Sequence, residues 1–325
     1  MSHAIRFHKT GGPDVLQWEE VKLAEPGAGE VRVANKAVGL NYIDTYHRTG
    51  LYPVPLPSGI GLEAAGVVEA VGPGVAEFRP GDRVAYCNGP LGAYSEAKIH
   101  PAERLVKIPE GVSFEQAACA MLQGLTVQYL LRRLLKVPQA GETVLFHAAA
   151  GGVGLIACQW AKALGVNVIG TVSSEEKAKL AREHGCTHTV IYTREDFVAR
   201  VKEITAGKGV PVVYDGVGKD TYLKSLDCLQ PRGLLALFGN ASGPVDALNT
   251  GLLSAKGSLY VTRPTLMSYV GKRDELVAAA KELFDHILAG RIDVGARQKY
   301  PLKDAERAHR DLEARKTTGS TVLIP

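Results

Sequence analysis

The chain has 325 residues, more than one hydrophobic core usually supports, so we expect about two domains. Hydrophobic residues make up 46% of the sequence and charged residues 22%, which excludes a disordered or collagen-like chain. The net charge of +4 arises from 38 basic and 34 acidic residues scattered along the chain, which is too dilute to indicate a nucleic-acid partner.

Cysteine spacing and hydropathy indicate the cellular compartment in which the protein is located. The five cysteines are widely spaced and never form a Cys-x-x-Cys pair, a pattern typical of reduced thiols. The start MSHAIRFHKTGG lacks the pattern of a signal peptide, and no run of about 18 uncharged apolar residues follows. We therefore expect a cytoplasmic protein with no membrane partner.

The first third of the chain is expected to be rich in β-structure. Short apolar strands at Val31–Asn35, Ala65–Val71 and Asp82–Tyr86 are separated by Gly and Pro. From Phe114 to Val137 the apolar residues recur at helical spacing, so a helix leads out of this region.

Residues 143–262 alternate apolar strands with helical stretches, which predicts a parallel sheet covered by helices on both faces. The predicted helices lie near 152–164, 175–184, 195–205 and 219–229. The predicted strands are Thr143–His147, Asn167–Val172, Thr189–Tyr192, Val210–Asp215, Leu234–Phe238 and Leu259–Thr262.

The last part of the chain is predicted to contain two more helices. One is amphipathic over 272–290, and the other spans Leu302–Arg315. The apolar end Thr321–Pro325 is expected to fold back onto the first domain.

The turn after the strand Thr143–His147 carries the strongest local motif. Ala148 begins the pattern Ala-x-x-Gly-x-x-Gly, and the candidate cofactor-binding residues are Gly151, Gly152, Val153 and Gly154. Small side chains let the backbone approach a pyrophosphate, and the N-terminus of the following helix attracts it. An ordinary packed turn would show the same glycines, but the position at the first strand of the alternating region favours dinucleotide binding.

The end of the second strand indicates which dinucleotide binds. Where an NAD site normally has an acidic residue, this chain has Ser173 and Ser174, followed by Lys177. Hydroxyls and a cation suit a 2′-phosphate, so we predict NADP(H). Two alternatives remain: Lys177 could be a solvated helix lysine and a serine could cap the helix, or Glu175 or Glu176 could reach a ribose.

Further cofactor contacts are predicted where strands end, since ligands of open α/β sheets bind at the carboxyl ends of the strands. Tyr192 ends the third strand and could lie against the adenosine. The remaining candidates lie at the ends of the fourth and fifth strands and are Val217, Phe238, Gly239 and Asn240.

Several segments together resemble the zinc-independent quinone oxidoreductases of the medium-chain dehydrogenase/reductase superfamily, which include zeta-crystallin. The resemblance covers the whole chain and is closest to bacterial NADPH:quinone reductases. It rests on Gly141–Gly154 with Gln159 and Lys162, Asn41–Tyr46, Gly50–Tyr52, Pro57–Glu63 and Gly124–Thr126.

The resemblance implies a two-domain architecture. A GroES-like catalytic domain would comprise residues 1–125 and 265–325, and a doubly wound Rossmann domain that binds NADP(H) would comprise 126–264. It also implies a homodimer formed through the last Rossmann strand, near Ser258–Thr262. The nicotinamide is expected near the positions matched by Asn41, Tyr46, Tyr52, Gln123 and Thr126.

The sequence departs from zinc-dependent relatives at the metal ligands. Asn41 stands where alcohol dehydrogenases have a catalytic cysteine, and Leu62 stands where they have a histidine. Cys87 is alone where they have four clustered cysteines. We therefore predict no metal ligand, and a zinc alcohol dehydrogenase is the weakest alternative.

Without a Lewis acid, a quinone is a suitable acceptor because it is already strongly electrophilic. The hypothesis is direct hydride transfer from C4 of NADPH, with Asn41 and either Tyr46 or Tyr52 orienting the quinone. The tyrosines could equally pack in a wall of the site. One alternative is an enone or alkenal reductase acting on a conjugated carbonyl compound. Another is an NADPH-binding structural or RNA-binding protein like zeta-crystallin, although the scattered charge argues against RNA.

Overall fold

The computed structural model describes residues 2–325, which divide by their contacts into two units. The first unit contains the chain up to Leu125 together with Val270–Gly290 and Val294–Pro325. The second unit contains Thr126–Tyr269 and Arg291–Asp293. No helix among residues 2–325 is both long and apolar enough to cross a membrane.

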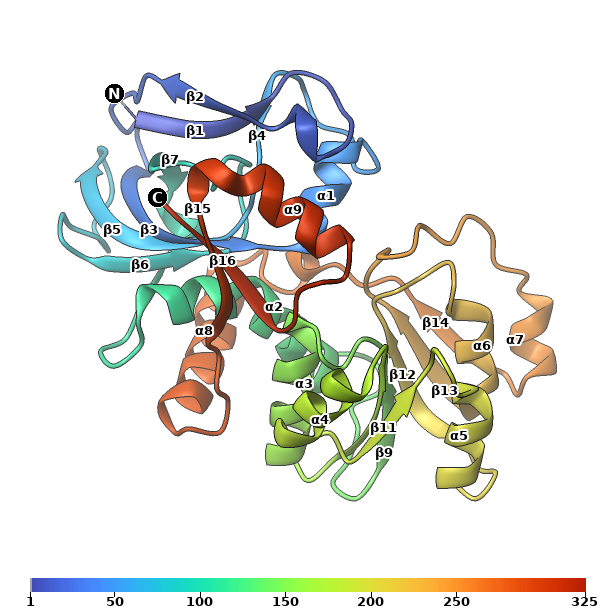
Figure 1. Cartoon of the computed structure of the whole chain (residues 1–325). Helices are drawn as coiled ribbons and strands as arrows, with labels where there is room; N and C mark the ends of the chain where they lie inside the picture. The colour runs from blue at the N-terminus through green and yellow to red at the C-terminus, as the bar shows by residue number, and fades with distance from the viewer. Residues whose placement is uncertain (1) are drawn as a thin grey trace. The chain divides into compact units, whose positions relative to one another are not determined.

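The second unit is built on a parallel sheet with the strand order β11–β10–β9–β12–β13–β14 (Figure 1). Its strands are β9 (Thr143–Phe146), β10 (Asn167–Val172), β11 (His188–Ile191), β12 (Val210–Asp215), β13 (Leu229–Leu237) and β14 (Tyr260–Thr262). Its helices are α3 (Gly152–Ala163), α4 (Glu175–Glu183), α5 (Phe197–Ile204), α6 (Tyr222–Asp227) and α7 (Gly251–Ala255). The predicted strand–helix alternation is confirmed.

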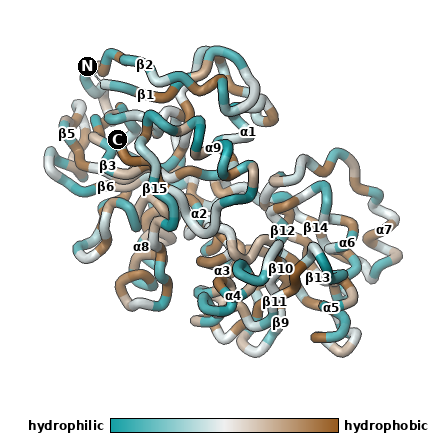
Figure 2. Tube along the Cα trace, in the orientation of Figure 1, coloured by the Kyte–Doolittle hydropathy of each residue, from teal (hydrophilic) through white to brown (hydrophobic). Residues whose placement is uncertain are grey.

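Burial explains why these apolar runs form strands. Every residue of β12 is buried, as expected for a strand covered on both faces of a parallel sheet. Figure 2 shows apolar colours among these strands and hydrophilic colours on α4. The core of the unit gathers side chains from strands and helices alike, including Leu145, Ile169, Val213 and Phe197.

Strand β13 begins five residues before the predicted strand. Its pairing with β12 jumps from Val210–Leu229 to Val212–Leu234, so the intervening residues form a bulge. Arg232 has a positive φ of 59° within that bulge. Pro231 and the irregular backbone interrupt the apolar pattern, so the sequence does not indicate the first part of the strand. Helix α7 was not predicted.

The first unit contains a larger, mostly antiparallel sheet and a smaller one. The larger has the order β15–β16–β3–β5–β6–β8, with β7 also paired to β3, and the smaller has the order β2–β1–β4. The strands are β1 (Ser2–Phe7), β2 (Gln17–Val21), β3 (Glu30–Leu40), β4 (Ser58–Gly59), β5 (Ala64–Val71), β6 (Arg83–Tyr86), β7 (Ala97–Pro101), β8 (Val106–Lys107), β15 (Ala296–Pro301) and β16 (Ser320–Ile324).

Helices of the first unit include α1 (Tyr42–Thr49), α8 (Arg273–Leu288) and α9 (Ala305–Glu313). Helix α2 (Phe114–Arg132) begins in the first unit and ends in the second. Short 3₁₀ turns are η1 (Pro13–Val15), η2 (Ala102–Arg104), η3 (Leu266–Ser268) and η4 (Leu302–Asp304).

The C-terminal strand completes the larger sheet of the first unit. β16 pairs antiparallel with β3, placing Thr321 opposite Leu40 and Leu323 opposite Val38. The prediction that the apolar tail folds back onto the first domain is therefore confirmed. This pairing also brings Ser320, next to the paired residues, into the buried interior.

Helix α1 was not predicted from the sequence, although its start carries a recognisable motif. Asn41 precedes the helix in an extended conformation, and its backbone N–H donates to the Asp44 carboxylate at 2.9 Å. This is the reciprocal contact of a capping box. The helix ends at Gly50, whose φ of 84° suits glycine.

Arg48 ties α1 to the C-terminal helix α9. Its guanidinium is buried and donates to Glu313 at 2.7 Å, to Nδ1 of His309 at 2.9 Å and to the Gly11 carbonyl at 3.1 Å. Because arginine only donates, Nδ1 of His309 accepts and Nε2 carries the proton. Nε2 then donates to the Tyr94 hydroxyl at 3.2 Å.

Arg48→Met is expected to lower the free energy of unfolding by about 2–4 kcal/mol, because His309 and Glu313 lose a buried donor. Urea denaturation followed by fluorescence measures this. Arg310 is the matched control, since it pairs with Glu306 at 2.7 Å on the exposed surface of α9. Arg310→Met should cost about 0.5 kcal/mol or less. Equal losses in the two variants would contradict the assignment of Arg48.

Candidate functional site

Asn41 and Gln123, both predicted site residues, meet in the interior of the first unit. Nε2 of Gln123 lies 3.2 Å from Oδ1 of Asn41. Nδ2 of Asn41 lies 2.6 Å from Oε2 of Glu63, and the Ser320 hydroxyl lies 2.7 Å from Oε1 of Gln123. All four side chains are buried. They come from the start of α1, the residue before β5, helix α2 and strand β16.

Glu63 is a buried carboxyl group that receives several hydrogen bonds. Besides Asn41, the donors are the backbone N–H of Leu122, 2.6 Å from Oε1, and the backbone of Met121. Burial raises the pKa of Glu63 to about 8, while the hydrogen bonds from Asn41, Leu122 and Met121 oppose that rise. A neighbouring negative charge at Asp44 adds to it.

The two predicted tyrosines also lie together. Tyr46 is buried on α1, and its ring centroid is 5.2 Å from that of Tyr52 in an edge-to-face arrangement. The Tyr52 backbone N–H donates to the Tyr46 carbonyl at 3.0 Å. The segment after α1 is thereby folded back against the helix, which fixes where Tyr52 lies.

Asp44 is a second buried carboxyl group in this region, and the sequence analysis did not select it. Its Oδ2 accepts from the Asn41 backbone and from the Tyr94 hydroxyl at 2.8 Å. Burial raises the pKa of Asp44 to about 7, and both hydrogen bonds oppose the rise. Asn41 thus contacts one buried carboxyl through its backbone and another, Glu63, through its side chain.

In the second unit the glycine turn has the geometry of a phosphate cradle. A Cβ atom at Gly154 would lie 2.3 Å from the Ala148 carbonyl oxygen, so only glycine fits against the turn. Ala148 adopts a positive φ of 57°, and Gly151 precedes α3 with no side-chain cap. The N–H groups at the start of α3 are therefore left for an anionic ligand, and the residues present fit a dinucleotide pyrophosphate.

The structure places the predicted 2′-phosphate residues together after β10. Ser174 precedes α4, and its hydroxyl accepts from the Lys177 backbone N–H at 3.3 Å, so it caps the helix as one alternative foresaw. Ser173 and the side chain of Lys177 are half-buried in the same segment. Glu175 is held by Arg182 at 3.2 Å and Arg194 at 2.7 Å.

Further predicted cofactor residues lie beyond the carboxyl ends of β11, β12 and β13, and Tyr192, which follows β11, is 40% exposed. A Cβ atom at Gly239 would lie 2.5 Å from the Gly216 carbonyl, so the ends of β12 and β13 approach closely. Val217, Phe238, Gly239 and Asn240 are half-buried there. Thr126 is buried on α2, where the contact division assigns it to the second unit.

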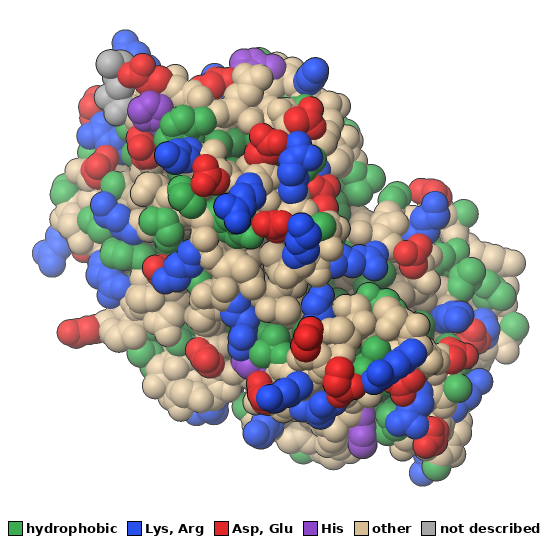
Figure 3. All heavy atoms as spheres, viewed as in Figure 1, with side chains coloured by type: hydrophobic (Ala, Val, Ile, Leu, Met, Phe, Trp, Pro, Cys, Tyr) green, Lys and Arg blue, Asp and Glu red, His purple; other side chains and the backbone are tan. Residues whose placement is uncertain are grey.

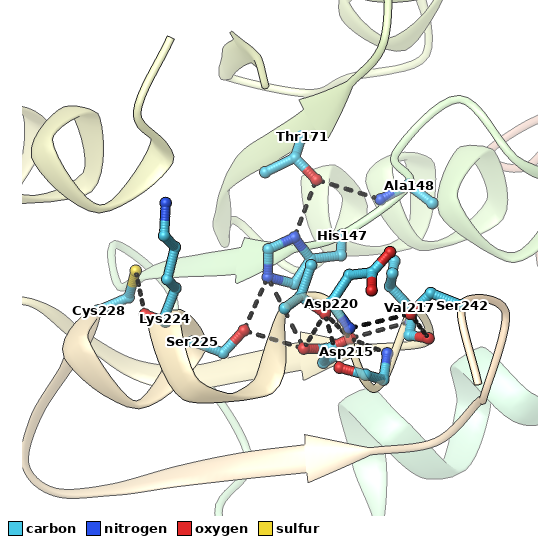
Figure 4. Close-up of polar contacts among 12 residues, drawn as sticks. His147, Ala148, Thr171, Asp215, Val217, Asp220, Lys224, Ser225, Cys228 and Ser242 are labelled. Carbon is cyan, nitrogen blue, oxygen red and sulfur yellow. Dashed lines mark hydrogen bonds and ion pairs between the residues drawn. The ribbon is translucent and has the colours of Figure 1, made fainter. Parts of the chain in front are cut away.

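A buried polar network supports this edge of the sheet (Figure 4). His147 contacts Thr171 through Nδ1 at 2.9 Å and Ser225 through Nε2 at 3.0 Å. Ser225 donates to Asp215 at 2.9 Å, and the Val217 backbone N–H donates to the same carboxylate at 2.9 Å. Burial lowers the pKa of His147, while the nearby Asp215 charge opposes this.

Sequence reasoning missed Glu63, Ser320, Asp44 and the His147 network. Glu63 lies 22 residues from Asn41 and Ser320 lies 197 residues from Gln123, so no local spacing reveals their contacts. Asp44, three residues after Asn41, was detectable as part of a capping box. Within residues 2–325, no three His, Cys, Asp or Glu side chains gather in a group that could hold a metal ion.

Comparison with known proteins gives two family matches. Residues 27–110 match the alcohol dehydrogenase GroES-like domain, and residues 152–285 match the zinc-binding dehydrogenase family. The chain is 60% identical to quinone oxidoreductase of Pseudomonas aeruginosa over 100% of both chains. It is 50% identical to 2-haloacrylate reductase of a Burkholderia species, over 100% of this chain and 99% of the relative.

Among solved structures, the chain is similar to Escherichia coli quinone oxidoreductase in complex with NADPH. The TM-score is 0.98 at 56% identity, covering 99% of this chain and 100% of that one. The fold is therefore a Rossmann-type parallel sheet with a GroES-like β-rich region, as the sequence predicted.

The raised pKa of Asp44 predicts a pH-dependent effect of Asp44→Asn. A carboxyl group whose folded pKa lies above its unfolded value stabilises less as pH rises toward the folded pKa, about 7. The variant lacks this titration, so its destabilisation relative to wild type should shrink between about pH 5 and pH 8. Denaturation at several pH values measures the difference, in which contributions from groups that do not interact with Asp44 cancel.

Asp311 provides the control, because its pKa is lowered by the hydrogen bond from Tyr300 and it stays ionised throughout this range. Asp311→Asn should change stability by the same amount at every pH. A constant difference for Asp44→Asn as well would show that Asp44 does not titrate near neutrality.

Proposed function

Because this chain belongs to the quinone oxidoreductase family of the medium-chain dehydrogenase/reductase superfamily, we propose that it reduces quinones with NADPH by metal-independent hydride transfer. The observation that carries this proposal is the full-length likeness to quinone oxidoreductases, one of them solved with NADPH. Asn41 and Leu62, which stand at the zinc-ligand positions of alcohol dehydrogenases, support the metal-independent part.

In this proposal residues 126–264 form the NADP(H)-binding domain, and residues 1–125 and 265–325 form the catalytic domain. The turn Gly151–Gly154 and the start of α3 hold the pyrophosphate. Ser173, Ser174 and Lys177 bind the 2′-phosphate, with Tyr192 beside the adenosine. Gln123 and Thr126 lie near the nicotinamide in this proposal, and Val217, Phe238, Gly239 and Asn240 make further cofactor contacts at the ends of β12 and β13.

Bound NADPH supplies the hydride, and the chain supplies binding and orientation. The buried carboxamide of Asn41, held by Glu63 and Gln123, presents fixed hydrogen-bonding groups to the acceptor. Tyr46 on α1 and Tyr52 just after it, whose rings pack together, orient the acceptor. A quinone needs only positioning and a few donors, because its reduction restores an aromatic ring.

A second candidate is reduction of an activated carbon–carbon double bond. One relative, 50% identical to this chain, is named 2-haloacrylate reductase, and this supports double-bond reduction as the second candidate. An RNA-binding role has less support, because Figure 3 shows basic and acidic side chains intermixed over the face in view. A panel of quinones and alkenals, with NADPH oxidation followed, separates the two reductase activities.

We also propose a homodimer and a cytoplasmic location. Strand β14 is the last in the order of its sheet, and Tyr260 on it is 49% exposed, which supports an interface there. All five cysteines of the described chain are free and buried, as suits a reducing compartment.

The direct test is reduction of 1,4-benzoquinone by the purified protein after chelator treatment, with NADPH and NADH compared. We expect turnover with NADPH to exceed turnover with NADH and to survive the chelator. Turnover that disappears with the chelator and returns with zinc would contradict the metal-independent mechanism. Tight NADPH binding without quinone turnover would transfer the proposal to the alkenal substrates.

Lys177→Gln tests the cofactor preference. Loss of a charge-assisted contact to the 2′-phosphate should lower kcat/KM for NADPH by about 10- to 100-fold and leave that for NADH nearly unchanged. Lys179→Gln, two residues along α4 with a 74% exposed side chain, is the control and should leave both values unchanged. An equal loss with both cofactors in Lys177→Gln would contradict the assignment.

A further inference from the structure

Four buried side chains in the first unit form a continuous chain of hydrogen bonds. Its order is Ser320, Gln123, Asn41 and Glu63, with contacts of 2.7, 3.2 and 2.6 Å. At its end, the other Glu63 oxygen receives the Leu122 backbone N–H at 2.6 Å. Each member comes from a different segment, so the chain exists only in the folded unit.

The donors in this chain of hydrogen bonds all point the same way, and Glu63 sets that direction. The Leu122 N–H can only donate, so Oε1 of Glu63 accepts. When Glu63 is ionised, Oε2 also accepts, so Asn41 turns its nitrogen toward Glu63 and its oxygen toward Gln123. Gln123 then presents its own oxygen to the Ser320 hydroxyl, which donates.

The backbone makes room for this carboxyl group at Gly39. A Cβ atom there would lie 2.3 Å from Oε2 of Glu63 and 2.3 Å from the Ala118 carbonyl oxygen. The Gly39 N–H also donates to the Glu63 carbonyl at 3.1 Å. The glycine in β3 therefore admits the Glu63 side chain to a tightly enclosed position.

We propose that Glu63 is a positioning residue, which fixes the orientation of the Asn41 and Gln123 carboxamides that face the substrates. The inference rests on the proposed function, in which Asn41 orients the acceptor. One Nδ2 proton of Asn41 is used by Glu63, and the second is held in a defined direction as a result. Glu63 itself does not touch the acceptor.

Glu63→Gln separates orientation from folding. An amide accepts at one end only, so the variant satisfies Leu122 with its oxygen and turns its nitrogen toward Asn41. Asn41 and then Gln123 must reverse to pair with it. The reversal ends at Ser320, whose hydroxyl can accept from Gln123 and donate to the Cys119 carbonyl, 3.5 Å away. Every group stays paired, while both carboxamides face the wrong way.

The first experiment measures quinone turnover and thermal unfolding of Glu63→Gln at about pH 9, above the pKa of Glu63, so that the wild-type carboxyl group is ionised. We expect the melting temperature to stay within a few degrees of wild type. In contrast, kcat/KM for the quinone should fall on the order of 10- to 100-fold, mainly through kcat. Unchanged turnover would overturn the proposal.

The second experiment does not depend on any activity. Ser320→Ala alone leaves one acceptor unpaired, but in the double variant with Glu63→Gln the reversed Gln123 has no acceptor for its N–H. A buried N–H left unpaired costs more than an unpaired carbonyl oxygen, so at the same pH the melting temperature of the double variant should fall by more than the two single shifts added together. Additive shifts would overturn the proposal, because residues at opposite ends of the chain couple only by reversing it.

Tyr86→Phe supplies the matched control for this coupling. Tyr86 is buried in the same unit and donates to Asn35 at 3.1 Å, outside the chain. Its shift should add to that of Glu63→Gln without coupling. If wild type reduces no quinone, the proposed function fails, and the Glu63–Ser320 coupling still decides whether Glu63 sets the orientation.

Discussion

Buried polar groups must find hydrogen-bond partners, and this requirement determines how the first unit is built around Asn41. Glu63 would be costly to bury alone, but it accepts from Asn41 and Leu122. Each donor is in turn fixed by its own element, so the carboxyl group, α2 and the start of α1 constrain one another. The capping contact from Asn41 to Asp44 locks the same residue through its backbone.

The second unit meets the same requirement at the edge of its parallel sheet. The Asp215 carboxylate accepts from the backbone N–H groups of Val217 and Gly218 and from the hydroxyls of Thr221 and Ser225. These contacts hold the segment after β12 in one shape. A binding edge that is rigid before the ligand arrives loses less conformational entropy on binding.

The sequence predicted the second unit well and the first unit less well, for physical reasons. Parallel strands buried on both faces are continuous apolar runs, and the Ala148–Gly154 turn is a local motif, so both are visible in the sequence. Helix α1 has eight residues and too little periodicity to be found that way. Strand order brings Glu63 to Asn41, and the pairing of the C-terminal strand brings Ser320 to Gln123; a local sequence pattern encodes neither contact.

The alternatives at Ser174 show how one residue can satisfy two interpretations. Its hydroxyl caps α4 through the Lys177 backbone, which the helix needs whether or not a cofactor binds. The same cap fixes the start of the helix on which the Lys177 side chain is mounted. Helix capping and the proposed preference for NADPH therefore both favour a serine at position 174.

The pairing of β16 with β3 has a consequence for how the protein is made. Strand β3 leaves the ribosome long before β16, one of its neighbours in the sheet. The whole of the second unit is translated in between. The second unit can therefore fold while the chain is still growing, whereas the first must wait with one edge of β3 open until β16 has been made. Ser320 reaches Gln123 only at that moment, so the proposed site is completed after the second unit has been translated.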